Sequence, residues 1–275
     1  MCAILPKFER FILVGDEKQL PAVVVQSENQ CKVELPELLD AGFSQLNLSL
    51  FERILANCQR NHWDYAFEML SYQYRTHETV AEFINRYFYH KLVAGSERQK
   101  SKNAVFENIN PDFLAKNRLI FIESEKEKYV KVNKSEARAV VFLLERIREA
   151  LGENFGTQSV GVITPYRAQI AEITALLDDD LRSKVTIDTV ERYQGSERDI
   201  IIISMAVNAE KMMENVQCLN ADKTTDKKLN VALSRAREQV ILLGNSAVLR
   251  KGIFYDKLLD FIECHLTIKD LGIKP

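Results

Sequence analysis

Ile200-Ile201-Ile202-Ile203 is an uninterrupted apolar run that follows directly on Arg198-Asp199. Runs of the same kind recur along the chain. They are Phe11-Ile12-Leu13-Val14, Leu119-Ile120-Phe121-Ile122, Val160-Gly161-Val162-Ile163, Val185-Thr186-Ile187 and Val240-Ile241-Leu242-Leu243. Continuous rather than alternating apolarity predicts strands that are buried on both faces. We therefore predict an α/β fold in which a parallel sheet is sandwiched by helices.

Helical patterns separate these runs. Asn133 and Glu136 have the spacing of a capping box, and apolar residues recur at helical spacing after them. Thr164 and Pro165 suit the N-cap and the first helical position of a helix over residues 166–177. Each helix directly follows a predicted strand or a short loop, as in an alternating α/β fold.

The organisation changes near Asn61-His62-Trp63-Asp64, where the apolar pattern loses its periodicity after a predicted helix over Ser49 to Cys58. We place a domain boundary there, which divides the chain into residues 1–65 and 66–275. Residues 207–228 are polar and irregular, and they predict a long loop.

Composition limits the classes of function. The chain has 275 residues, of which 46% are hydrophobic, so it can form a substantial core. Its 37 basic and 39 acidic residues give a net charge of −2, and any contact with nucleic acid must therefore be local. A strongly basic nucleic-acid-binding surface over the whole molecule is excluded.

Cysteine and histidine usage argues against metal chemistry. The five cysteines form no C-x-x-C pair and the four histidines have no metal-ligand spacing, so we expect no metal site and no disulfide framework. No apolar run approaches the roughly eighteen residues that span a membrane. We expect a cytoplasmic protein, or a nuclear one in a eukaryotic cell, with no membrane partner.

The first polar motif is Gly15-Asp16-Glu17-Lys18-Gln19-Leu20-Pro21, which follows the predicted strand at residues 11–14. It has three interpretations: a simple exit from a strand, an acidic pair that holds Mg²⁺ through water, or a sensor loop. The Gln-Leu-Pro sequence favours the sensor loop. In that role the amide of Gln19 can both donate to and accept from a phosphate or an attacking water.

Two further motifs carry polar groups between buried segments. Gln73-Tyr74-Arg75-Thr76-His77 places an arginine just before a predicted helix, where its guanidinium can reach phosphoryl oxygens. After Tyr193, Gln194-Gly195-Ser196-Glu197 is a polar turn between two buried strands and has no purpose in packing. Gly195 allows a close backbone approach, and Glu197 can accept a hydrogen bond from a hydroxyl group.

The last motif is Leu229-Asn230-Val231-Ala232-Leu233-Ser234-Arg235-Ala236-Arg237. Nowhere does the chain contain a G-x-x-x-x-G-K-[ST] loop, which would hold the β- and γ-phosphates of a nucleotide. The sequence therefore carries groups that can sense a phosphate but no loop that can cradle one.

Together and in this order, the motifs resemble those of the superfamily 1 helicases, in the branch of the nonsense-mediated-decay helicase, senataxin-like proteins and Dna2-type helicases. The resemblance covers nearly the whole chain. It implies two RecA-like domains of the P-loop NTPase type that clasp ATP. Residues 1–65 would be the C-terminal remnant of the first domain, with motif III, and residues 66–275 the second domain, with motifs IV to VI.

The resemblance also implies roles for single residues. Catalytic roles pass to Gln19 of motif III, Arg75 of motif IV and Arg235 of motif VI, with both arginines facing the γ-phosphate. The nucleotide-binding positions are Asp16, Gln19, Arg75, Gly195, Glu197 and Arg235. The positions along the nucleic-acid backbone are Pro21, Thr164, Pro165, Tyr166 and Thr189. The family's Ser-x-Val-Arg sequence reads Ser204-Met205-Ala206-Val207 here, which puts strand contact by that segment in doubt.

The function implied is the C-terminal motor portion of an ATP-dependent helicase that translocates on single-stranded DNA or RNA. The cofactor would be ATP with Mg²⁺, and the phosphate loop (Walker A) and the D-E-x-x-Q motif (Walker B) would lie upstream of Met1. The partners expected are single-stranded nucleic acid and the missing N-terminal RecA-like domain, in a monomeric protein. We expect the isolated chain not to hydrolyse ATP efficiently. The alternative is a catalytically silent RecA-like module that binds nucleic acid or a partner.

Overall fold

A computed structural model describes residues 9–22, 24–106, 109–128 and 131–273. The chain divides into two compact units, of which unit 1 ends at Leu70 and unit 2 begins at Ser71. The expected boundary between residues 65 and 66 lies inside unit 1. The backbone N–H of Trp63 donates to the carbonyl of Cys58, so the chain that follows the last long helix of unit 1 turns back onto it.

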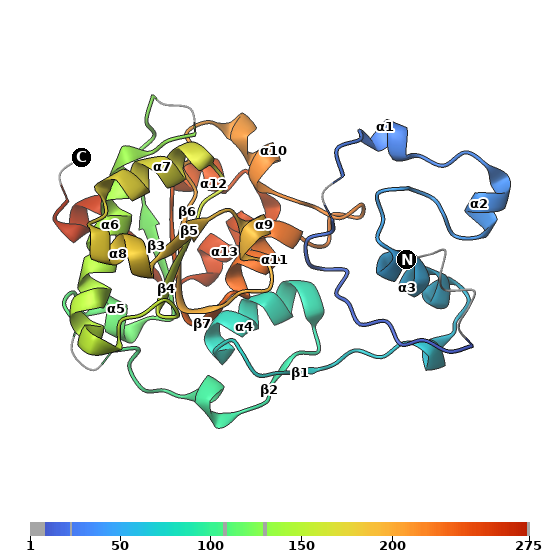
Figure 1. Cartoon of the computed structure of the whole chain (residues 1–275), viewed down its shortest axis with the longest axis horizontal. Helices are drawn as coiled ribbons and strands as arrows, with labels where there is room; N and C mark the ends of the chain where they lie inside the picture. The colour runs from blue at the N-terminus through green and yellow to red at the C-terminus, as the bar shows by residue number, and fades with distance from the viewer. Residues whose placement is uncertain (1–8, 23, 107–108, 129–130, 274–275) are drawn as a thin grey trace. The chain divides into compact units, whose positions relative to one another are not determined.

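Figure 1 labels the elements along the chain. The strands are β1 (Tyr72–Gln73), β2 (Val93–Ala94), β3 (Leu119–Glu123), β4 (Val160–Ile163), β5 (Thr186–Asp188), β6 (Arg198–Ser204), β7 (Ala236–Gly244) and β8 (Cys264–Thr267). The α-helices are α1 (Glu28–Cys31), α2 (Pro36–Asp40), α3 (Leu50–Arg60), α4 (Glu78–Ile84), α5 (Phe113–Lys116), α6 (Lys134–Leu151), α7 (Arg167–Leu176), α8 (Asp179–Lys184), α9 (Val190–Tyr193), α10 (Met213–Val216), α11 (Lys227–Leu233), α12 (Ser246–Leu249) and α13 (Ile253–Phe261). A π-helical segment and short 3-10 segments complete the list: η2 (Asp64–Ala66), η3 (Asn85–Tyr89), η4 (Glu97–Lys100), η5 (Gly152–Asn154), η6 (Glu210–Met212) and η7 (Ile268–Leu271).

Unit 2 is built on a six-stranded parallel sheet with the strand order β5-β4-β6-β7-β3-β8. The predicted runs at residues 119–122, 160–163, 200–203 and 240–243 form its four central strands, and β5 lies one residue later than its predicted run. The predicted α/β fold with a helix-covered parallel sheet is confirmed.

The two faces of the sheet pack against different helices (Figure 1). Ile120, Val162 and Ile202 point to one face and belong to a buried cluster with residues of α6, α7 and α8. Ile201 and Leu242 alternate with them and are also fully buried, on the face where α11 contacts β6 and β7 and α4 contacts β7. Burial on both faces explains why these strands read as continuous apolar runs.

The predicted strand Phe11-Ile12-Leu13-Val14 is wrong. Ile12 and Val14 are 93% and 83% exposed, and the segment has no regular secondary structure. A strand buried on both faces needs neighbouring strands, and the described part of unit 1 offers only an isolated antiparallel bridge between Lys32 and Gln45. The predicted helix at Ser49 is correct, since Ser49 caps α3.

Two predicted helix starts need correction. Thr164 and Pro165 are not the N-cap and first residue of α7, because Tyr166 is the N-cap and the helix begins at Arg167. Thr164 instead extends β4, since its backbone N–H donates to the carbonyl of Asp188 over 3.1 Å. The predicted loop at residues 207–228 is interrupted by η6 and α10, whose apolar side chains are buried.

The predicted capping box before α6 is only half formed. The Asn133 side chain accepts from the Glu136 backbone N–H over 2.9 Å, as predicted. The Glu136 carboxylate does not return to Asn133 but lies fully buried at the carboxyl edge of the sheet. There it accepts from the hydroxyls of Ser124 and Ser204, each over 2.8 Å, and from the Ala206 N–H over 2.9 Å. Glu136 therefore joins α6 to the loops that follow β3 and β6.

This burial makes the stability of the protein depend on pH. Burial, with a smaller contribution from Glu127, raises the pKa of Glu136 from 4.5 to about 7. The folded chain holds this proton more tightly than the unfolded chain. The free energy of unfolding should therefore fall by about 3 kcal/mol as the pH rises from below 4.5 to above about 7. Glu136→Gln removes the titration, so urea denaturation should show a flatter pH profile for the variant. Parallel profiles of the two proteins would contradict this.

Candidate functional site

The amino ends of β6 and β7 bring two of the predicted motifs together. The Arg198 N–H donates to the Arg235 carbonyl over 3.0 Å, so the turn before β6 lies beside the end of α11. Gly195 in this turn has a φ of +86°, which favours glycine, and no atom lies within 4 Å of the position that a Cβ would take. In this structure Gly195 therefore serves the turn and not a close packing contact.

Arg75 joins the same edge from a distant part of the sequence. The His77 N–H donates to the Arg237 carbonyl over 2.7 Å and so attaches the segment before α4 to β7. The Arg75 Nε forms an ion pair with the Glu197 carboxylate, and its Nη1 lies 3.4 Å from the Ser234 carbonyl oxygen. The structure thus brings Arg75 and Glu197, both predicted nucleotide-binding residues, into direct contact.

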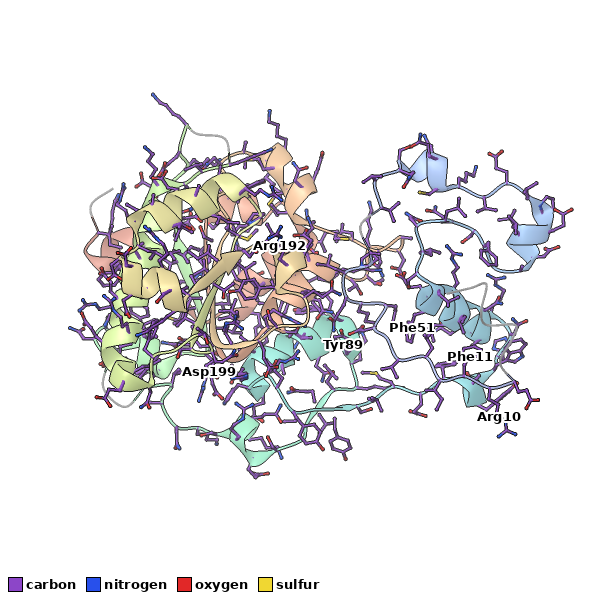
Figure 2. All side chains as sticks on the ribbon, viewed as in Figure 1. Arg10, Phe11, Phe51, Tyr89, Arg192 and Asp199 are labelled. Atoms are coloured by element: carbon purple, nitrogen blue, oxygen red, sulfur yellow. The ribbon has the colours of Figure 1, made fainter. Side chains whose placement is uncertain are left out.

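Arg237 completes this cluster and was not among the predicted site residues. Its Nη2 donates to Glu197 over 2.8 Å and its Nη1 to Asp199 over 3.0 Å, and Asp199 is labelled in Figure 2. The signal in the sequence was the second arginine of Ser-Arg-Ala-Arg, two residues after Arg235. We call Arg75, Glu197, Asp199 and Arg237 the arginine cluster.

The cluster keeps Glu197 ionised. Partial burial by itself would raise the pKa of Glu197, but hydrogen bonds from Arg237 and Arg75 outweigh it and hold the pKa below its ordinary value. The side chains of Arg75 and Glu197 are 37% and 33% exposed, so solvent and ligands can reach them. One carboxylate thus lies between two guanidinium groups, and the cluster as a whole carries both signs of charge.

Arg235 lies deeper than its predicted role implies. It is only 2% exposed. Its Nε donates to the Val231 carbonyl over 3.1 Å and its Nη2 to the Ser234 hydroxyl over 2.9 Å. Its Nη1 lies 3.4 Å from the Ser196 carbonyl. Arg235 therefore supports the backbone on which the arginine cluster stands.

The motif III residues lie in unit 1 and interact with one another. The Gln19 Nε2 donates to the Asp16 carboxylate over 2.8 Å, and the Lys18 N–H donates to the other carboxylate oxygen over 3.0 Å. Pro21 is partly exposed and follows this turn. Asp16 and Gln19 therefore form a local turn of their own, within unit 1.

The predicted nucleic-acid positions of unit 2 lie at the opposite, carboxyl edge of the sheet. Thr164, Pro165 and Tyr166 follow β4, and Thr189 follows β5. The hydroxyl groups of Thr164 and Tyr166 are buried and have no hydrogen-bond partner. Leaving a buried hydroxyl unpaired costs about 1–3 kcal/mol. The Lys131 ammonium lies 5.9 Å from the Tyr166 ring centre.

A groove of about 690 Å³ borders this edge beside β5. Arg167, Arg182 and Arg192 contribute cationic groups from α7, α8 and α9, and Arg192 is labelled in Figure 2. Asp188 also lines the groove and forms an ion pair with Arg192 over 3.6 Å. Arginine side chains next to Tyr166 and Thr189 are suited to phosphate contacts.

Over residues 9–22, 24–106, 109–128 and 131–273, no three His, Cys, Asp or Glu side chains gather in a way that could hold a metal ion. Within those ranges, no helix has the length and apolarity needed to cross a membrane.

Arg75 and Arg235 differ in burial, so we expect their substitution by alanine to change the free energy of unfolding by different amounts. Arg75→Ala should lower the free energy of unfolding by less than about 1 kcal/mol, because its ion pair is partly exposed. Arg235→Ala should lower it by about 2–4 kcal/mol, because it empties a buried site and removes donors from buried carbonyls. Urea denaturation of both variants measures the difference. Equal losses would show that the arginine cluster is as much a part of the core as Arg235.

Comparisons with known proteins show which family the chain resembles. Residues 46–247 match the family described as "AAA domain". The chain is 32% identical to the DNA replication ATP-dependent helicase/nuclease DNA2 of Gallus gallus, over 94% of this chain and 22% of that protein. It is 28% identical to Helicase sen1 of Schizosaccharomyces pombe, over 92% of this chain and 14% of that protein.

The chain is also similar to one further helicase and to one solved structure. The DNA polymerase alpha-associated DNA helicase A of Saccharomyces cerevisiae is 26% identical, over 89% of this chain and 35% of that protein. A solved C-terminal domain of a possible DNA helicase from a Lactobacillus matches 71% of this chain and 99% of its own, with 13% identity and a TM-score of 0.38. The chain thus spans only 14–35% of the length of the three helicases DNA2, sen1 and helicase A. By its AAA domain and these relatives, the chain belongs to the superfamily 1 helicases, in the branch of Dna2 and Sen1.

Proposed function

We propose that this chain is the C-terminal motor portion of an ATP-dependent helicase that couples ATP hydrolysis to translocation on single-stranded DNA or RNA. The arginine cluster is the observation that carries the proposal. Arg75 and Glu197 are 122 residues apart in sequence and meet at one edge of the sheet. The ion pairs there are too exposed to contribute much stability, so their convergence is better explained by a ligand.

The chemistry of the cluster fits a phosphoryl group. A guanidinium binds phosphoryl oxygens with paired hydrogen bonds, and Arg75 is exposed enough to exchange its Glu197 partner for a more highly charged one. Glu197 and Arg237 would then hold each other and keep the edge in place. ATP, when bound, supplies the free energy that drives the motor. The loop that holds the phosphates of ATP, and the ligands of Mg²⁺, would come from a phosphate-loop segment and a D-E-x-x-Q segment in a longer protein.

The carboxyl edge is the proposed strand-binding surface. Thr164, Tyr166 and Thr189 lie where parallel α/β sheets bind their ligands. The groove with Arg167 and Arg192 adds cationic groups that can follow a phosphodiester backbone. Such contacts read the backbone and not the bases, and they suit a motor that moves along any sequence.

Both proposed sites lie on one sheet, and that placement suggests how they are coupled. If Arg75 engages a phosphate held by another domain, unit 2 moves as a body and carries its strand-binding edge with it. We propose that the motor works as a monomer in the cytoplasm or nucleus. We also propose that the 275-residue chain alone does not hydrolyse ATP efficiently.

A second candidate is a catalytically silent module that binds nucleic acid or a partner. The observation that favours it is that Arg75 is already paired with Glu197 and Arg235 is already bonded to backbone carbonyls. In a silent module these groups serve the structure alone. A longer protein that includes a phosphate loop would then hydrolyse no ATP, with or without Arg75.

Arg75→Ala tests the proposal more cleanly than a change at Arg235, because Arg75 contributes little to stability. In a longer protein with an intact phosphate loop, strand-stimulated ATP turnover should fall by about 10³- to 10⁵-fold. Strand affinity without nucleotide should not change, since Arg75 lies at the opposite edge. Turnover is measured by phosphate release and affinity by fluorescence anisotropy.

Arg148→Ala is the matched control. Arg148 is also a partly exposed arginine in an ion pair, with Asp178 at the N-cap of α8, but it lies outside the cluster. Its loss should leave turnover within about twofold of the unmodified protein. Near-normal turnover of the Arg75 variant, or an equal loss in both variants, would rule out a phosphoryl contact by Arg75.

A further inference from the structure

The Glu136 carboxylate is the centre of a buried polar network at the carboxyl edge. It accepts hydrogen bonds from the loop after β3, through Ser124, from the last residue of β6, Ser204, and from the loop after β6, through Ala206. Glu136 and Ser204 are 0% exposed, and Ser124 is 1% exposed. Ala206 has a φ of +47°, a conformation that a non-glycine residue rarely adopts and that its hydrogen bond to Glu136 helps to hold.

The network continues to the segment that carries the proposed strand contacts. The Gln169 Nε2 donates to the Ser204 hydroxyl over 3.0 Å and to the Asn133 carbonyl over 2.9 Å. The Gln169 Oε1 accepts from the Asn133 N–H over 2.8 Å. Gln169 lies in the first turn of α7, directly after Tyr166 and its neighbours. One set of buried groups therefore fixes the loops after β3, β4 and β6 relative to one another.

A carboxyl group is not needed to pack α6 on the sheet. Apart from Ser135 in the first turn, the other buried residues of this helix are apolar and include Leu143, Leu144 and Ile147. A hydrophobic side chain of similar volume at position 136 would avoid the cost of burying an ionisable group. What an apolar residue could not do is accept three hydrogen bonds, from the end of β6 and from the loops after β3 and β6.

We propose that Glu136 is a positioning residue for the strand-binding edge. Through Ser204 and Gln169 its carboxyl group holds the Thr164–Tyr166 turn and the loop at Ala206 in the arrangement that binds single-stranded nucleic acid. This inference rests on the proposed function at this edge. It assigns to the segment 204–207 a supporting role, because all four of its residues are buried.

The test compares two substitutions at one position. Glu136→Met keeps the volume but accepts none of the hydrogen bonds, whereas Glu136→Gln keeps an acceptor and the shape. We expect the affinity of the 275-residue chain for a fluorescein-labelled oligothymidylate to fall about tenfold in Glu136→Met and to stay within about threefold in Glu136→Gln. Ser204→Ala cuts the link to Gln169 with little change in volume, and it should weaken binding about fivefold even if Glu136→Met does not fold.

Leu144→Ala is the matched control. Leu144 lies on the same helix and is 0% exposed, so its truncation destabilises the protein without touching the network. At a temperature where all variants are folded, Leu144→Ala should bind the oligonucleotide like the unmodified chain. An equal loss of affinity in Leu144→Ala, or unchanged affinity in folded Glu136→Met and Ser204→Ala, would overturn the proposal.

Amide hydrogen exchange gives a readout that does not depend on strand binding. In Glu136→Met, exchange should rise together in residues 124–128, 131–133, 164–169 and 204–208, and Leu144→Ala should not reproduce that pattern. If the unmodified chain binds no oligonucleotide, the proposed function at this edge is wrong and the strand-binding part of this inference falls with it. The exchange pattern then decides alone whether Glu136 holds the loops, and unchanged exchange overturns that part too.

Discussion

The central strands of unit 2 can be buried on both faces only because helices cover the sheet from either side. Because helices cover both faces, the sheet exposes polar groups mainly where its strands begin and end. The arginine cluster stands at the amino ends of β6 and β7, and the Glu136 network at the carboxyl ends of β3 and β6. The position of each candidate site therefore follows from the burial of the sheet between them.

Strand β6 connects the two sites directly. It begins at Arg198, next to Glu197, and ends at Ser204, which donates to Glu136. Seven extended residues span on the order of 20 Å, so the two sites are separate but joined by a single rigid element. A force applied at the arginine cluster would reach the carboxyl edge without any change inside the sheet.

The two edges differ in their electrostatics. At the amino edge, Arg75, Glu197 and Arg237 are partly exposed, which makes their ion pairs weak and exchangeable. At the carboxyl edge, Glu136 is fully buried, and its hydrogen bonds are protected from competition with water. The first arrangement suits a site that exchanges ligands, and the second suits a support that keeps one geometry.

The sequence by itself determined five of the six strands of the sheet and two of the four charged residues of the arginine cluster. A continuous apolar run indicates a buried strand from neighbouring residues alone, so five of the six predicted strands were correct. Glu197 stood out in a polar turn without a role in packing, and Arg75 as a cation just before a predicted helix. Tertiary structure alone decided which groups meet. It left Phe11-Ile12-Leu13-Val14 without a sheet, turned Glu136 from its capping box into the interior, and placed Arg235 inside while Arg237 took the position beside Glu197. The physical reason is that hydrogen bonds and ion pairs depend on the positions of groups far apart in sequence, whereas apolar periodicity depends only on neighbours along the chain.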